Sequence, residues 1–225
     1  MPKNLTDQDV ADFRDRLCDV AEPLFAEHGA EAVTIRQLAG ALGVSAMTPY
    51  RYFTDKDAIL AAVRARAFDR HAQALEDARA APAKGAPERA NAIGAAYVRF
   101  ALENPEAYKL MFDIRQPNAE AYPDLMRAMA RSRATMTAHL QDLAAAGLFD
   151  GDPGYVGHLY WAALHGPIML HLSGMLEAPI DAGALIAGLT SAIARAHVIT
   201  SPSRERSRAA PSAPGEWFGR GQTRR

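Results

Sequence analysis

The chain has 225 residues, of which 49% are apolar, enough for one large packed domain or two small ones. Its net charge of -1 gives the whole molecule no electrostatic attraction to nucleic acid or to an acidic membrane, so such binding must depend on local placement of charge. The single cysteine, Cys18, excludes an internal disulfide and a multi-cysteine metal site. With no signal-peptide pattern and no apolar run of about 18 residues, we expect a cytoplasmic protein.

Alanine, leucine and arginine are abundant and long runs of β-branched residues are missing, which predicts an all-α fold of about nine helices. Apolar spacing, caps and breakers place these helices at residues 6–28, 34–43, 45–53, 56–80, 88–103, 106–113, 124–147, 153–176 and 180–198. Pro23 favours a kink in the first helix. Two short helices joined by Gly-Val-Ser at residues 43–45 are typical of a helix-turn-helix.

The second helix of a helix-turn-helix can enter the DNA major groove, where its first side chains meet base edges and its flanks contact phosphates. The candidates for base edges are Ala46, Met47, Thr48, Arg51 and Tyr52, and Ser45 at the start of the helix is a further candidate DNA contact. The candidates for phosphates are Thr34, Tyr50 and Lys56, which stand at helix ends. Pro49 leaves the geometry open, because one backbone hydrogen bond is lost if Ser45 caps the helix and none if Thr48 does.

Residues 8–60 resemble the N-terminal DNA-binding domain of the tetracycline-repressor (TetR) family. The residues that match the family pattern are Phe25, Gly29, Thr34, Ile35, Leu38, Ala39, Gly43, Val44, Ser45, Tyr50, Phe53 and Lys56. The resemblance implies a homodimeric, ligand-responsive transcription factor, usually a repressor, that binds a palindromic double-stranded DNA operator. It also implies base contacts for Arg36 and Thr48 and phosphate contacts for Tyr50 and Lys56.

The C-terminal half resembles, over residues 160–174, the Trp…His-Gly segment that names one ligand-domain class of this family. Aromatic and thioether side chains typical of an apolar pocket also cluster between residues 97 and 112. We therefore expect a small hydrophobic effector, held by one hydrogen bond from His165 or a tyrosine hydroxyl, and we disfavour a strongly charged one. The predicted lining is Tyr97, Phe100, Tyr108, Met111, Phe112, Trp161 and His165.

The last two predicted helices, about 154–176 and 180–198, should form a homodimer, because the final one combines an apolar face with small residues. The chain then divides into a helix-turn-helix DNA-binding domain, a connecting helix, a ligand-binding and dimerisation domain and a disordered basic tail. These parts span residues 1–55, 56–80, 87–199 and 200–225.

Other interpretations of the same residues stay open. Tyr50 can pack inside, Arg36 and Arg51 can be solvated surface charges, and the aromatic cluster can be plain core. Histidines 158, 165 and 171 lie seven and six residues apart, which does not suit a helical metal site, and no nucleophile stands beside His165. We expect no metal, cofactor or catalytic site. The alternative functions are a ligand-dependent activator of the same family, or a helical small-molecule-binding protein or enzyme without DNA binding.

Overall fold

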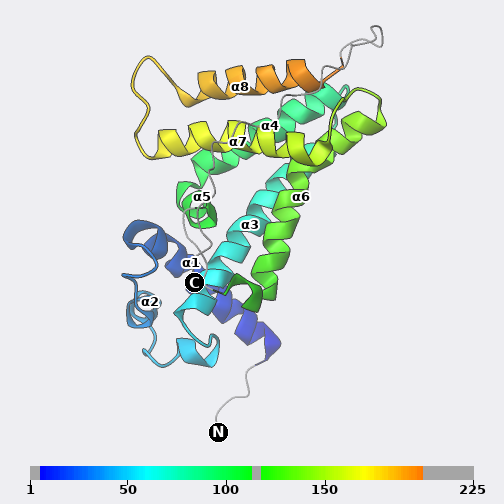
Figure 1. Ribbon diagram of the computed structural model, residues 1–225. Helices are drawn as coiled ribbons and strands as arrows, with labels where there is room; N and C mark the ends of the chain where they lie inside the picture. Colours follow the sequence, from blue (N-terminus) through cyan, green and yellow to red (C-terminus); the bar gives the residue numbers. More distant parts are fainter. Residues whose placement is uncertain (1–5, 113–117, 200–225) are drawn as a thin grey trace, which may run out of the picture.

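The computed structural model describes residues 6–112 and 118–199, which fold into packed helices (Figure 1). The α-helices are α1 (Asp7–His28), α2 (Ile35–Ala41), α3 (Lys56–Ala80), α4 (Ala86–Glu103), α5 (Pro105–Phe112), α6 (Pro123–Ala145), α7 (Pro153–Leu172) and α8 (Ala182–His197). Two short 3₁₀ helices are η1 (Pro49–Arg51) and η2 (Ala119–Ala121). The described residues form no strand, and one isolated β-bridge joins Phe149 to Val198. The all-α prediction is confirmed, with eight α-helices in the described part of the chain where about nine were expected.

The difference lies in the third predicted helix, over residues 45–53, where the structure has only the 3₁₀ helix η1. Pro49 has no N–H to donate to Ser45, so an α-helical bond at that position cannot form. The chain instead makes bonds of the tighter type, from the Thr48 amide to the Ser45 carbonyl (2.9 Å) and from the Arg51 amide to the Thr48 carbonyl (3.1 Å). Thr48 occupies the N-cap position, and its side chain makes no capping bond.

The long helix α3 connects two hydrophobic cores and runs through the middle of Figure 1. Asp55 begins it by accepting a hydrogen bond from the Ala58 amide at 2.7 Å, which is the predicted cap. Its first turns pack Ile59 and Val63 into the head core, shared with α1 and α2. Its later turns pack Phe68 into the body core, shared with α4 to α7. The head core includes Phe13, Leu17, Phe25, Leu38, Phe53 and Leu110.

The helices α7 and α8 form an antiparallel pair at the end of the molecule away from α2 (Figure 1). α7 ends at Leu172, earlier than predicted, because Gly174 turns the chain with a φ of 67°. Asp181 caps α8 by accepting from the Ala184 amide at 2.8 Å. No residue of α8 is buried, so this helix covers α7 and presents its other face outward.

Two further sequence predictions concern the C-terminal tail and Pro23 in the first helix. The basic tail predicted at residues 200–225 lies outside the described residues. α1 continues as one helix across Pro23, with Gly29 ending it through a bond from its amide to the Phe25 carbonyl. Within residues 6–112 and 118–199, no helix has both the length and the apolarity needed to cross a bilayer.

Candidate DNA-binding surface and ligand cavity

The tip of the head is a tight turn between α2 and η1. Gly43, with a φ of 73°, allows the chain to reverse, and the Val44 amide bonds back to the Ala39 carbonyl at 2.9 Å. The hydroxyls of Ser45 and Thr48 lie 2.9 Å apart, which closes the next turn. Backbone and side-chain bonds therefore fix the whole segment that leads into η1.

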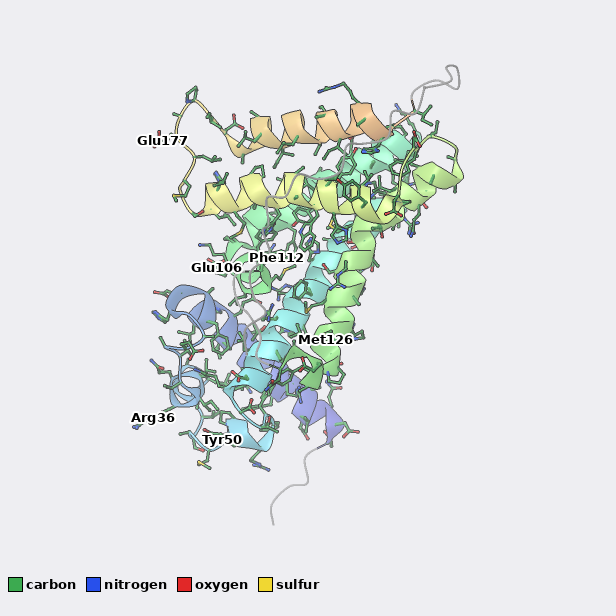
Figure 2. The ribbon with its side chains drawn as sticks, viewed as in Figure 1. Arg36, Tyr50, Glu106, Phe112, Met126 and Glu177 are labelled. Atoms are coloured by element: carbon green, nitrogen blue, oxygen red, sulfur yellow. The ribbon has the colours of Figure 1, made fainter. Side chains whose placement is uncertain are left out.

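Seven of the ten predicted DNA-contact residues are exposed, and all of these except Thr34 lie at this tip. Met47 is 70% exposed and Tyr50 50%, unusually high values for large apolar and aromatic side chains. Figure 2 shows Arg36 and Tyr50 at the same end of the molecule. The exposed set at the tip is Arg36, Ser45, Ala46, Met47, Tyr50 and Arg51. The structure thus brings together, on α2 and η1, two arginines, a phenol and short side chains without burying them.

The other four predicted residues already have partners inside the head. Thr34 caps α2 in a reciprocal arrangement with Gln37. Thr48 is half-buried and bonded to Ser45, and the Tyr52 ring stacks on Phe13 with centroids 3.9 Å apart. The Lys56 ammonium donates to the backbone carbonyls of Ala30 (2.6 Å) and Glu31 (3.2 Å). Tyr52 and Lys56 therefore stabilise the head, and a DNA contact by either side chain would be additional to this role.

The head carries no excess of positive charge. Over residues 29–58 the basic side chains are Arg36, Arg51 and Lys56, and the acidic ones are Glu31, Asp55 and Asp57. The carboxylates of α1 near α3 are paired, as in the 2.7 Å bond from Arg66 to Asp19. Attraction to phosphates must then come from the two exposed arginines and from helix N-termini rather than from net charge.

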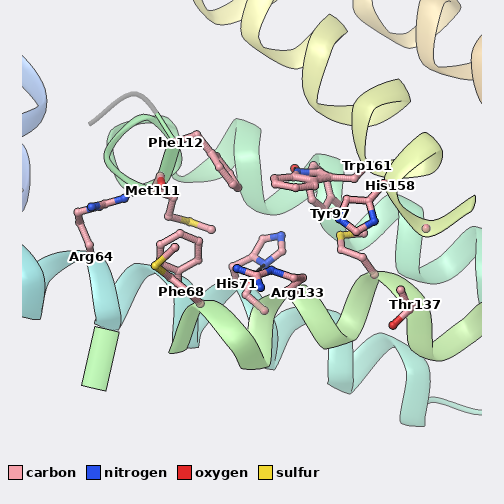
Figure 3. Close-up of a pocket in the computed structure, with 14 residues that line it drawn as sticks. Arg64, Phe68, His71, Tyr97, Met111, Phe112, Arg133, Thr137, His158 and Trp161 are labelled. Carbon is pink, nitrogen blue, oxygen red and sulfur yellow. Dashed lines mark hydrogen bonds between the residues drawn. The ribbon is translucent and has the colours of Figure 1, made fainter. Parts of the chain in front are cut away.

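A cavity of about 260 Å³ lies in the body between α3, α4, α5, α6 and α7 (Figure 3). Its walls are mainly aromatic rings and thioethers, with a few polar groups from α3 and α6. The lining residues are Arg64, Phe68, His71, Tyr97, Met111, Phe112, Met129, Ser132, Arg133, Met136, Thr137, Gly157, His158 and Trp161. An apolar enclosure with few polar groups is typical of a small-molecule site.

The predicted lining is only partly correct in its geometry. Tyr97, Met111, Phe112 and Trp161 line the cavity, whereas Phe100, Tyr108 and His165 do not belong to its wall. Phe100 is buried in the body core, where its ring lies 5.2 Å from that of His71.

Tyr108 and His165 belong to a hydrogen-bond chain behind the cavity wall. The Trp161 indole donates to the Tyr97 hydroxyl (3.1 Å), which lies 2.8 Å from the Tyr108 hydroxyl, itself 2.7 Å from His165 Nδ1. His165, expected to be a polar partner of the ligand, therefore bonds to Tyr108 and fixes the wall. Burial also raises the pKa of Tyr97, so its phenol stays protonated.

Two polar residues of α3 reach this region from inside the protein. Arg64 is 5% exposed and donates to the carbonyls of Leu110 (2.9 Å) and Met111 (3.1 Å), at the C-terminal end of α5. Burial lowers the pKa of its guanidinium. His71 is 1% exposed, with Nδ1 3.0 Å from the Ser132 hydroxyl. Its Nε2 has no hydrogen-bond partner among the described residues.

Two family models match the two halves of this molecule. Residues 17–63, which form the turn and its supporting helices, match the model of bacterial regulatory proteins of the tetR family. Residues 90–193, which surround the cavity, match a tetracyclin repressor-like C-terminal domain. The chain belongs to the TetR family. It is a DNA-binding transcriptional regulator.

Solved structures share the fold of this TetR-family chain. A protein of unknown function from Rhodococcus sp. RHA1 is 27% identical, with a TM-score of 0.71 over 87% of this chain and 98% of that one. The TetR-family regulator PfmR from Thermus thermophilus is 24% identical, with a TM-score of 0.64 over 80% and 98%. SmeT, the repressor of the Stenotrophomonas maltophilia efflux pump SmeDEF, is 19% identical, with a TM-score of 0.61 over 83% and 91%. None of the curated proteins matches the chain.

Sequence reasoning about this TetR-family regulator missed Arg64 and His71, because α3 was interpreted only as a connector. Their spacing held a signal, since residues 64, 68, 71 and 75 follow the helical repeat and place both polar residues on the same face as Phe68 and Leu75. The assignment to the Trp…His-Gly ligand-domain class stays a prediction.

Proposed function

We propose that the protein is a homodimeric repressor that binds a palindromic operator through α2 and η1 and is released when a small apolar ligand fills the body cavity. Regulators of the TetR family bind DNA and form dimers. The exposed set at the head tip supports the DNA-reading part of this proposal, because Arg36, Tyr50 and Arg51 have no packing role that would explain their exposure.

The outward face of α7 and α8 supports the dimer. Leu170 and Tyr155 of α7 are 43% and 64% exposed, and Leu189 of α8 is 45% exposed beside the small residues Gly188 and Ala192. Ile186 and Ile193, one turn of α8 before and after Leu189, pack toward the protein itself, so Leu189 stands at the edge of the outward face. An isologous pairing of these helices would bury the outward face and set two heads about 34–36 Å apart, or a multiple of this spacing.

The proposed ligand response is supported chiefly by the positions of two consecutive residues of α5. Leu110 packs in the head core, whereas Met111 packs in the body core and lines the cavity. Arg64 of α3 binds the backbone carbonyls of both. A ligand that displaces Met111 or Phe112 must therefore move a segment that the head core also contains, and it shifts the head only if it binds two arrangements unequally.

We propose a regulator without catalytic activity. Ser132 and His71 form the one serine–histidine hydrogen bond at the cavity wall, but nucleophilic catalysis also needs a third group that orients the imidazole. His71 Nε2 has no such partner among the described residues. The proposed division of the chain at residues 55, 80 and 87 is supported by the two separate cores, although α3 and α5 contribute to both.

Selection of bound DNA from a random pool, followed by anisotropy titration of the selected site, tests the proposal. We expect a palindromic site and a bound dimer, and release of the DNA by an apolar compound from a ligand screen. The variant Leu189→Glu should give a monomer by light scattering and weaken operator binding, with Met126→Glu, an exposed residue of α6, as the control that stays dimeric. If the Leu189→Glu variant remains a dimer by light scattering, the proposed interface is wrong.

A further inference from the structure

The cavity wall contains a buried polar atom that the fold leaves without a partner. His71 lies on α3, 1% exposed, with its ring edge-on to Tyr97 (5.0 Å) and Phe100 (5.2 Å). Its Nδ1 is paired with the Ser132 hydroxyl, while its Nε2 has no hydrogen-bond partner among the described residues. Buried polar atoms are nearly always satisfied, so this one calls for an explanation. Figure 3 shows His71 between the wall residues Phe68 and Tyr97.

The hydrogen-bond pattern identifies which nitrogen carries the proton. In the described part of the chain, the Ser132 hydroxyl has His71 Nδ1 as its only hydrogen-bond partner. If Nδ1 were protonated, two hydrogens would compete for that contact and the buried hydroxyl hydrogen would have no acceptor. The satisfied arrangement has the Ser132 hydroxyl donating to Nδ1, which leaves the hydrogen on Nε2. Burial lowers the pKa of His71 to about 4, so the imidazole is neutral near pH 7.

The shape and lining of the cavity restrict what can accept that hydrogen. Its volume of about 260 Å³ exceeds the roughly 150 Å³ that holds a benzene molecule in an apolar protein cavity, so a ligand of one to two fused rings fits. Phe68, Phe112 and Trp161 offer ring faces and edges, and Met111 and Met136 offer polarisable sulfur. These contacts favour a flat aromatic molecule.

The charges around the cavity disfavour an ionised ligand. Among the described residues, no carboxylate lines the wall. Arg64 is committed to the carbonyls at the C-terminal end of α5, where the helix dipole already supplies partial negative charge. Arg133 also lines the cavity but is exposed to solvent, so water would screen its attraction to a carboxylate, while a carboxylate beside the buried His71 would lose its hydration.

We propose that the cavity takes an uncharged aromatic molecule of one or two rings whose single hydrogen-bond acceptor, such as a ketone oxygen, is held by His71 Nε2–H. This inference rests on the proposed ligand-responsive function and specifies the ligand class of the same cavity. The donor on α3 then acts as the specificity-determining group, and the ring-lined wall supplies the binding area.

The experiment compares three compounds that share one ring system: naphthalene, 2-acetylnaphthalene and 2-naphthoate. Binding to the full-length protein without DNA is measured by calorimetry in two buffers, which also reports proton uptake. We expect the ketone to bind about 5- to 100-fold more tightly than naphthalene, because it satisfies a donor that is otherwise buried and unpaired, and to bind without proton uptake. The naphthoate should bind more weakly than the ketone.

The variant His71→Phe with Ser132→Ala removes the donor and its partner together and keeps a planar ring, so neither polar group is left alone. It should bind naphthalene and the ketone equally. The matched control is His139→Phe, since His139 is also a buried neutral histidine with an unpartnered nitrogen but does not line this cavity. This control should keep the ketone preference.

If the parent protein binds the ketone no more tightly than naphthalene, or if the double variant still prefers the ketone, His71 Nε2–H is not the donor that holds the ligand. Tightest binding of the naphthoate with uptake of a proton overturns the uncharged class, and so does failure of both neutral compounds to bind. These outcomes are distinct from failure of the proposed function, because that failure would appear as absence of operator binding or of any ligand-induced release in the anisotropy assay.

Discussion

Replacement of Arg64 by methionine tests whether this guanidinium holds the end of α5 against α3. The two charge-assisted bonds, at 2.9 and 3.1 Å, are worth about 1.5–3 kcal/mol each, and they satisfy carbonyls that the helix end leaves unpaired. Methionine keeps the apolar stem and relieves the burial of a charge, which offsets part of that loss. We therefore expect the free energy of unfolding to fall by about 2–4 kcal/mol.

The assay is denaturant unfolding at one fixed protomer concentration, since the stability of a dimer depends on concentration. The control is Arg66→Met on the same helix, where the arginine is half-exposed and pairs with Asp19 at 2.7 Å. A pair of that kind contributes about 0–1 kcal/mol. Equal losses for the two variants would refute the reasoning, because Arg64 would then be an ordinary surface-type contact. The Arg64→Met protein should also release operator DNA less in response to ligand.

Three further predictions concern packing, pH and DNA. Gly157→Ala should lower the free energy of unfolding by about 1–2 kcal/mol, because its Cβ would lie 2.8 Å from a methyl of α6, whereas Gly94→Ala, with open space, should raise it by about 0.5–1 kcal/mol. Burial lowers the pKa values of His71 and His139 from an ordinary 6.5 to about 4. The free energy of unfolding should therefore be fully present above pH 6.5 and fall as the pH drops toward 4, and His139→Gln should make this fall with pH less steep. Arg36→Ala should weaken operator binding by about 1–3 kcal/mol and relax the preference at one base pair.

The sequence was most informative where a local signal determines the local structure. Asp55 caps α3 and Thr34 caps α2, where these two helices were predicted to begin. These outcomes depend on a few neighbouring residues, so spacing and capping rules are sufficient to predict them. Pro49 shows the limit, because its missing N–H was recognised but its effect on the helix depended on which residue capped it.

The cavity was harder to predict because its wall comes from five helices. Aromatic residues of α4, α5 and α7 could be proposed from composition, yet composition could not separate wall residues such as Trp161 from supporting ones such as Tyr108. α3 packs against both the head and the body, so its buried residues lie on several of its faces. Its sequence therefore shows no single apolar stripe in which a buried polar residue would stand out. The decisive atom, His71 Nε2, is recognisable only once every possible partner has a position.

A ligand of the proposed class would gain two kinds of interaction on one face of α3. The apolar wall offers van der Waals contacts, and the buried His71 Nε2–H offers a hydrogen bond. Binding energy alone does not move the head, because only the difference in affinity between two arrangements shifts their populations. Two walls of the cavity adjoin the head core directly: Leu110 precedes the lining residues of α5, and Val63 precedes the lining residue Arg64 on α3. We propose that the positions of these two segments, rather than the affinity of the ligand, determine how much of the binding energy reaches the DNA-reading surface.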